Sequence, residues 1–172
     1  MSTEEELQEN AEHAHNPFDK KVAASMAVIA AALAVVSVLG HIYTTEELLG
    51  QQKASDQWSY YQAKSIRRYE STFAADVFAT LKAPDAAAKY KANIEKYERE
   101  GKEIQEKATD LEKESALSGR RALRLHFGEV FLEIAIVFAS LAILSKRPLL
   151  WWTALASGAG GAAIALSTVL LK

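Results

Sequence analysis

The chain has 172 residues, a formal net charge of −2 and no cysteine. Without cysteine it cannot form disulfides, zinc-thiolate sites or thiol intermediates. The long polar segment 44–124 intersperses 15 bases with 14 acids, so nucleic acid is not an expected partner. The apolar residues are concentrated in three blocks, and each block is long enough to cross a bilayer.

The first 18 residues are polar and acidic, and we expect a disordered tail without a cleavable signal peptide. The pair His13-x-His15 in this tail is expected to be incidental rather than a metal site. Asn16-Pro17 ends the tail, because a residue before proline is pushed away from helix, and Asp19 is the expected N-cap. Residues 19–43 then form the first transmembrane helix, an uncleaved anchor.

Residues 44–124 contain a single proline and no run of β-branched residues, which predicts helix throughout. Ala83-Pro84-Asp85 is the only convincing turn, and it divides the segment into two arms of about 58 Å each if fully helical. We therefore predict an antiparallel helical hairpin, resembling a coiled coil. Its residues should pair almost symmetrically about Pro84.

The descending arm of this hairpin keeps a seven-residue repeat in steps of three and four. Its seam positions alternate small with large side chains, which lets two helices approach closely. They are Ala87, Tyr90, Ile94, Tyr97, Gly101, Ile104, Ala108, Leu111, Ser115, Ser118, Ala122, Leu125 and Glu129. The ascending arm is less regular, and its expected inner wall is Trp58, Tyr61, Ile66, Tyr69, Phe73 and Val77.

Residues 125–144 and 149–171 are the expected second and third transmembrane helices. The fold class is therefore all-α, a three-pass membrane protein with a long hairpin between the first two spans. Small residues at helical spacing indicate where helices pack in lipid. In the first span these are Ala23, Ala27, Ala30 and Ala34, and in the third Ser157, Gly158, Gly161 and Ala162.

Polar residues interrupt the second span on one helix face. His126, Glu129, Glu133 and Ser140 share this face, and symmetric pairing puts Glu129 between His41 and Ser37 of the first span. Glu133 meets no polar group of the first helix. Three interpretations remain open: a proton- or cation-responsive site at an oligomer axis, interhelical hydrogen bonds that hold the bundle together, or a segment that does not span fully.

An aromatic and basic run in the ascending arm is the most distinctive local sequence. It offers a candidate surface for a partner protein or a lipid headgroup, but packing within the hairpin, with Lys and Arg on a solvated face, is the favoured interpretation. The residues concerned are Trp58, Tyr60, Tyr61, Lys64, Arg67 and Arg68.

The same run carries a family resemblance. Together with Asn16-Pro17-Phe18 and the segment from Glu129 to Ala142, the sequence Trp58-x-Tyr60-Tyr61-Gln62-Ala63-Lys64-Ser65 resembles the bacterial membrane family catalogued as domain of unknown function 4337. The resemblance implies a bacterial inner-membrane protein with several spans. It implies no activity.

We expect a non-enzymatic protein in the lipid bilayer, without cofactor or metal, that forms a homo-oligomer through its hairpin and its small-residue seams. The alternatives are an ion or proton channel that uses Glu129 and Glu133, and an accessory subunit of a larger membrane complex. Lys20, Lys21, Lys146 and Arg147 favour a cytoplasmic N-terminus and an extracytoplasmic hairpin. Arg120, Arg121 and Arg124 at the other end of the second span weigh against that orientation.

Overall fold

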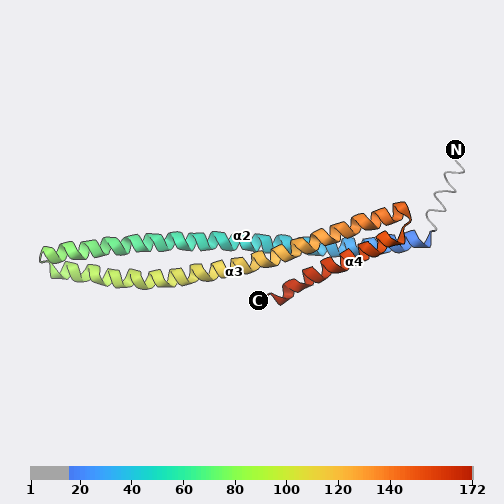
Figure 1. Cartoon of the computed structure of the whole chain (residues 1–172). Coiled ribbons are helices and arrows are strands. Elements are labelled where there is room, and N and C mark those ends of the chain that lie inside the picture. Colours follow the sequence, from blue (N-terminus) through green and yellow to red (C-terminus); the bar gives the residue numbers. More distant parts are fainter. Residues whose placement is uncertain (1–15, 172) are drawn as a thin grey trace, which may run out of the picture. The chain divides into compact units, whose positions relative to one another are not determined.

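The computed structural model describes residues 16–171, and the acidic tail expected at 1–18 lies almost wholly outside that range. Within it the chain is helical, with α2 at Pro17–Thr80, α3 at Pro84–Ser145 and α4 at Pro148–Leu166, followed by the short 3-10 helix η1 at Ser167–Leu170. No strand occurs among these residues. Figure 1 shows α2 and α3 as two long antiparallel helices, which confirms the predicted hairpin.

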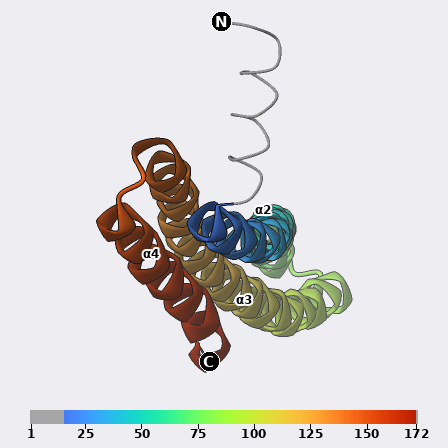
Figure 2. The same ribbon diagram turned by 90° about the vertical axis from the view of Figure 1, so that its right-hand side faces the viewer.

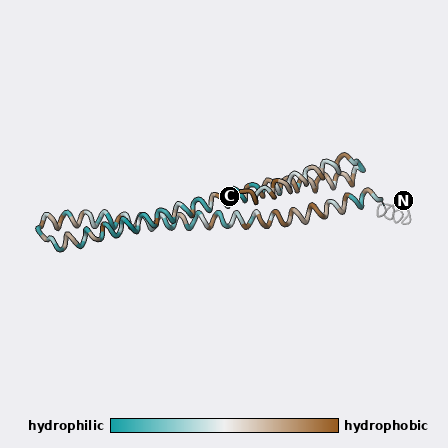
Figure 3. Tube along the Cα trace, turned by 90° about the horizontal axis from the view of Figure 1, so that it is seen from below, coloured by the Kyte–Doolittle hydropathy of each residue, from teal (hydrophilic) through white to brown (hydrophobic). Residues whose placement is uncertain are grey.

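The chain divides into two compact units. The hairpin unit is Thr45–Ser118, and the bundle unit comprises the described residues up to Thr44 together with those from Gly119 onward. Three helices, α2, α3 and α4 with η1, contain stretches long and apolar enough to cross a membrane. Colouring by hydropathy shows these apolar stretches in the bundle unit and mostly polar residues in the hairpin unit (Figure 3).

The start of α2 differs from the prediction. The Asn16 side-chain oxygen accepts a hydrogen bond from the Phe18 amide at 3.0 Å, so Asn16 is the N-cap and Pro17 occupies the first helical position. Asp19 is therefore not the cap. Its carboxylate instead forms an ion pair with Lys146, which joins the start of α2 to the end of α3.

The turn between α2 and α3 lies where the sequence placed it, immediately before Pro84. Lys82 adopts a left-handed conformation with φ of 56°, and the Ala83 amide donates to the Phe78 carbonyl at 2.9 Å. This arrangement satisfies the last carbonyls of α2, and Pro84 then starts α3 because proline needs no amide partner at a first helical position.

The core of the bundle unit lies where α2, α3 and α4 meet (Figure 2), and half of its ten buried residues are alanines. Along α4 and η1 the buried positions recur in steps of four and three, at Ala154, Gly158, Gly161 and Ala165 of α4 and Thr168 of η1. Small side chains let the helix backbones approach closely, which matters in lipid because burying apolar surface gains little there.

The core of the hairpin unit confirms the seven-residue repeat of the descending arm. The repeat positions of α3 within this unit are all buried or half-buried, and Gly101 lies against the Tyr61 ring, a small residue facing a large one. The Phe78 and Tyr90 rings stack at 5.5 Å next to the turn. Pairs such as Phe78–Tyr90 and Trp58–Glu112 lie nearly symmetrically about Pro84, as predicted.

The inner wall of the ascending arm was predicted only in part. Trp58 and Tyr61 are half-buried, but Ile66, Tyr69, Phe73 and Val77 are exposed. The actual inner positions keep their own steps of three and four and include polar side chains. They are Glu47, Gly50, Ala54, Gln57, Tyr61, Lys64, Arg68, Ser71, Ala75 and Phe78. Of these positions the sequence prediction included only Tyr61, because it selected large apolar side chains and most of the others are small, polar or charged.

Candidate functional site

A polar cluster occupies the contact between α2 and α3 inside the bundle unit. Nδ1 of His126 lies 3.2 Å from the Glu129 carboxylate, and Nε2 of the same ring lies 3.2 Å from the Thr44 hydroxyl. Ser37 is a second hydrogen-bonding neighbour of Glu129. The polar groups therefore form one connected network, and His126 joins the two helices at its centre.

The His41 ring completes this cluster. It meets the His126 ring edge-on with centroids 6.3 Å apart, and it lies within electrostatic range of the Glu129 carboxylate. His41, His126 and Ser37 thus all lie near the Glu129 carboxylate, and the 3.2 Å ring nitrogen contact to it is that of His126. Gly40 leaves space for the His126 ring, since a β-carbon at position 40 would lie 3.3 Å from that ring.

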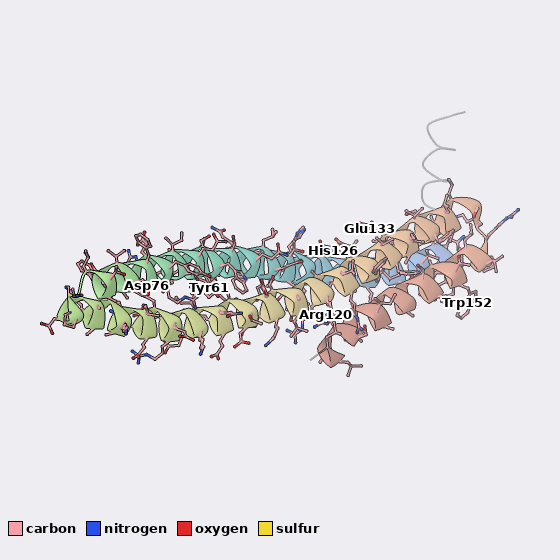
Figure 4. The ribbon with its side chains drawn as sticks, turned by 60° about the vertical axis from the view of Figure 1, so that its left-hand side comes forward. Tyr61, Asp76, Arg120, His126, Glu133 and Trp152 are labelled. Carbon is pink, nitrogen blue, oxygen red and sulfur yellow. The ribbon has the colours of Figure 1, made fainter. Side chains whose placement is uncertain are left out.

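The other two polar residues of this span do not join the cluster. The Ser140 hydroxyl donates to the Ile136 carbonyl at 3.0 Å and lies 3.6 Å from the Met26 sulfur. Glu133 is exposed on the side of α3 away from α4 (Figure 4). Among the described residues, its carboxylate has no hydrogen bond and no ion pair.

The contacts between α3 and α4 give the depth of Glu133 in the apolar region. The Ser157 hydroxyl donates to the Phe131 carbonyl at 2.7 Å, and Gly158 adjoins Ala135. Glu133 is therefore level with residues near 158, which are the middle of the segment Pro148–Leu170.

The predicted packing residues divide into two groups. Gly158 and Gly161 are buried, and Ser157 and Ala162 are half-buried, so the small patch of α4 is a helix contact. Gly101 and Ala108 are buried in the hairpin unit. The alanine seam of α2, in contrast, is exposed at Ala23, Ala27, Ala30 and Ala34. The bundle is packed through Val22, Ile29 and Val36 instead, because these larger residues fill the space beside α3.

Sequence reasoning missed Gly128. A β-carbon on Gly161 would lie 2.7 Å from the Gly128 carbonyl oxygen, and one on Gly128 would lie 2.9 Å from the Gly161 carbonyl oxygen. The two backbones therefore cross in direct contact. The signal was available, because Gly128, Ala135, Ala139 and Ala142 recur on one face of α3.

Two arginines hold the end of the last helix, which sequence alone gave no reason to expect. Arg121 donates to the Leu171 carbonyl at 2.9 Å, and Arg124 donates to the Ser167 carbonyl at 3.0 Å. Carbonyls at a helix C-terminus lack helical partners and carry partial negative charge, so cations stabilise them. The Arg121 guanidinium also lies 5.6 Å from the centre of the Tyr43 ring.

The aromatic and basic run of α2 contributes mainly to packing within the hairpin unit. Tyr61 lies between the two arms (Figure 4), and the Trp58 indole donates to Glu112 at 2.7 Å. Lys64 is half-buried and points to α3, Arg68 is half-buried, and Tyr60 and Arg67 are exposed. Most of the predicted interaction surface is therefore an internal contact.

A half-buried ion pair lies at the middle of that contact. The Lys64 ammonium lies 2.7 Å from Glu100, 5.2 Å from the centre of the Tyr60 ring and 5.5 Å from that of Tyr97. The hydrogen bond to Glu100 raises the pKa of Lys64, and the same bond lowers the pKa of Glu100. Both groups are thus held in their charged forms.

The described residues contain no group of three histidine or acidic side chains placed to hold a metal ion. Fold and polar cluster together define an all-α protein with three helices suited to cross a membrane and a helical hairpin. The chain belongs to the family described as domain of unknown function DUF4337, whose profile matches residues 18–171. No curated protein and no solved structure matches it.

Proposed function

We propose that this chain is a non-enzymatic integral membrane protein of the bacterial inner membrane, with three spans, that assembles into a homo-oligomer. The observation that carries the proposal is Glu133. It is a carboxylate level with the middle of an apolar segment, exposed beside Val130, Ile134 and Val137, and it has no hydrogen-bond or ion-pair partner within residues 16–171.

An exposed carboxylate at this depth is unstable against lipid. Its insertion costs at least about 2.5 kcal/mol, so Glu133 requires protein, water or a shared proton beside it. A second copy supplies these at the right depth, because copies inserted in one orientation hold the same residue at the same level. Two Glu133 side chains then share a proton and hydrogen-bond each other across the symmetry axis.

The exposed alanine seam of α2 supports the same interface. Ser37 approaches Glu129 and Met26 approaches Ser140, so this side of α2 adjoins the polar side of α3. Ala30 and Ala34 lie at helical spacing from Ser37, on the outward part of that side. Small residues on an exposed face allow another helix to approach closely in lipid, where close packing and hydrogen bonds drive association.

The mass of the protein in detergent and in lipid nanodiscs tests this proposal. We expect a single oligomer for the native chain, weakened in Glu133→Leu and largely retained in Glu133→Gln, whose amide still forms hydrogen bonds. Val137→Ala, a substitution one turn away on the same exposed side, is the matched control and should leave the mass unchanged. A native chain that is monomeric in nanodiscs contradicts the proposal and favours an accessory subunit.

A channel is the second candidate, because Glu133 and Ser140 are both exposed and lie two helical turns apart on one side of α3. In a ring of subunits they would line a common axis. Proteoliposomes should then show cation or proton flux that falls in Glu133→Gln while the oligomer persists. An intact oligomer without flux excludes this candidate.

The proposed orientation keeps the N-terminus in the cytoplasm, on the side of Lys20, Lys21, Lys146 and Arg147. Because the chain has no cysteine, Ala92→Cys introduces a single labelling site at an exposed position of α3 in the hairpin unit. Labelling of Ala92→Cys by a membrane-impermeant maleimide on intact spheroplasts supports an extracytoplasmic hairpin. Labelling only after lysis reverses the orientation.

A further inference from the structure

The outer face of α2 in the hairpin unit carries a second seven-residue repeat, distinct from the inner one. Its positions follow steps of three and four, and every one of them is exposed. They are Leu48, Gln52, Ser55, Ser59, Gln62, Ile66, Tyr69 and Phe73, with Val77 one further step of four along the helix. The four large apolar residues nearest the turn are those that the sequence had placed inside the hairpin.

None of these positions is charged, although six charged residues occur between Leu48 and Phe73. Two of the six, Lys64 and Arg68, instead belong to the inner wall of the hairpin. The other four, Lys53, Asp56, Arg67 and Glu70, are exposed on either side of the stripe. The stripe itself is therefore uncharged, which is unusual for the outward face of a helix in water.

The apolar part of the stripe is large for a surface in water. Ile66 is 58% exposed, Tyr69 65% and Phe73 73%. With Val77 the four neighbouring large side chains expose about 470 Å², taking about 200 Å² for each such side chain when fully exposed. That lies within the roughly 300–600 Å² of the largest apolar patch on a typical monomer, and it is more than half of the roughly 800 Å² that each partner buries in a standard interface. Leu48 is exposed on the same stripe about 27 Å farther along the helix.

We propose that this stripe is the contact between the hairpins of two copies of the chain, paired in parallel and in register. The inference deepens the proposed homo-oligomer and rests on it. Copies in one membrane share one orientation and are related by an axis along the membrane normal, so each residue lies level with its own counterpart. A repeat in steps of three and four is the pattern that parallel helices use to pair.

The composition of the stripe suits this pairing. Ile66, Tyr69 and Phe73 form successive apolar layers, while Ser55, Ser59 and Gln62 form small or hydrogen-bonding layers. In a parallel pair each residue faces its own counterpart, so a charged position would face a like charge. Because the stripe is uncharged, this repulsion does not arise.

Single cysteines test the contact, because the chain has none of its own. In membranes treated with a mild oxidant, Ser55→Cys and Ser59→Cys should each form a disulfide between copies about tenfold faster than Ala63→Cys, because paired side chains have a high effective concentration. Ala63 is also exposed but is not one of the stripe positions. Adding Ile66→Ser and Phe73→Ser should abolish the difference, whereas Ala63→Ser should preserve it.

The outcomes separate this inference from the proposed function. Rapid crosslinking at one of the two serines alone indicates antiparallel pairing and overturns the parallel register. Equal rates at all three positions, together with a native oligomer in nanodiscs, reject the stripe but keep the oligomer. A monomer in nanodiscs with equal rates rejects both.

Discussion

The Lys64 ammonium lies 2.7 Å from the Glu100 carboxylate, so one ion pair joins the two arms of the hairpin between the rings of Tyr60 and Tyr97. The Lys64 side chain is only 14% exposed and that of Glu100 29%. A partly buried lysine is destabilised when its carboxylate is removed, because the remaining charge has lost its compensation. The pair therefore selects one register of the hairpin among those that an alternating seam allows.

This ion pair predicts a pH window for the stability of the hairpin. The pKa of Glu100 is lowered on folding, so its contribution is present above the ordinary glutamate pKa and is lost as the pH falls through the folded value. The pKa of Lys64 is raised, so its contribution is present below the ordinary lysine pKa and is lost as the pH rises through the folded value. Thermal unfolding across this range should show a plateau between the two limits.

Glu100→Gln should remove the fall in melting temperature at acidic pH, and it should lower the melting temperature on the plateau. Glu98→Gln is the matched control, since Glu98 is 50% exposed and pairs only with Lys102 on the same helix. If Glu98→Gln changes the profile as much as Glu100→Gln does, the fall at acidic pH does not come from this ion pair.

The crossing of α3 and α4 predicts opposite effects of alanine at two adjacent glycines. Gly161→Ala puts a methyl group 2.7 Å from the Gly128 carbonyl oxygen, so the helices must separate, at a cost of about 1–3 kcal/mol. At Gly160 an added methyl group meets nothing within 4 Å, and the gain in helix propensity should be up to about 1 kcal/mol. Unfolding in detergent measures both, and equal losses would contradict the close crossing.

The arginine contacts predict local unfolding at the end of α4. Arg124→Met removes the hydrogen bond to the Ser167 carbonyl, and a charged hydrogen bond contributes about 1.5–3 kcal/mol. Hydrogen exchange of residues 164–170 should therefore become faster in this variant. Arg120→Met is the control, because Arg120 is exposed and contacts neither Ser167 nor Leu171. Unchanged exchange in Arg124→Met would show that the end of α4 is held by other contacts.

The polar cluster predicts a coupled loss. Glu129→Leu leaves the His126 ring nitrogen and the Ser37 hydroxyl without their acceptor, and a stranded polar group costs about 1–3 kcal/mol. Glu129→Gln keeps an acceptor and should cost less. A double-mutant cycle between Glu129→Leu and Ser37→Ala should show coupling, because both substitutions remove one shared contact. Additive losses of stability would show that Ser37 and Glu129 are not energetically coupled, and this would contradict the prediction.

Much of the architecture could be predicted from local patterns. Apolar blocks, the three-four repeat of the descending arm and the single proline turn are short-range features, and each depends on residues within a few turns of one helix. Symmetry about Pro84 then predicted that His41 and Ser37 meet Glu129, because two continuous helices joined by a short turn can pair in few registers. His126 lies one turn before Glu129 on α3, and its contact with Thr44 of α2 follows from the same symmetry.

The tertiary structure decided which face of each helix is inside. Ile66, Tyr69 and Phe73 are hydrophobic and exposed, while Lys64 and Ser71 are polar and turned inward, because the close approach of α3 accepts small side chains and a paired charge. In the bundle unit the larger residues are inside, because Val22, Ile29 and Val36 fill the space beside α3. The small residues Ala23, Ala27, Ala30 and Ala34 are outside. The sequence alone determined that this chain forms long helices with apolar spans and a hairpin, since helix formation depends on neighbours along the chain. Packing between helices decided which residues remain exposed and available to another copy. The periodicity of a single helix carries no information about that packing.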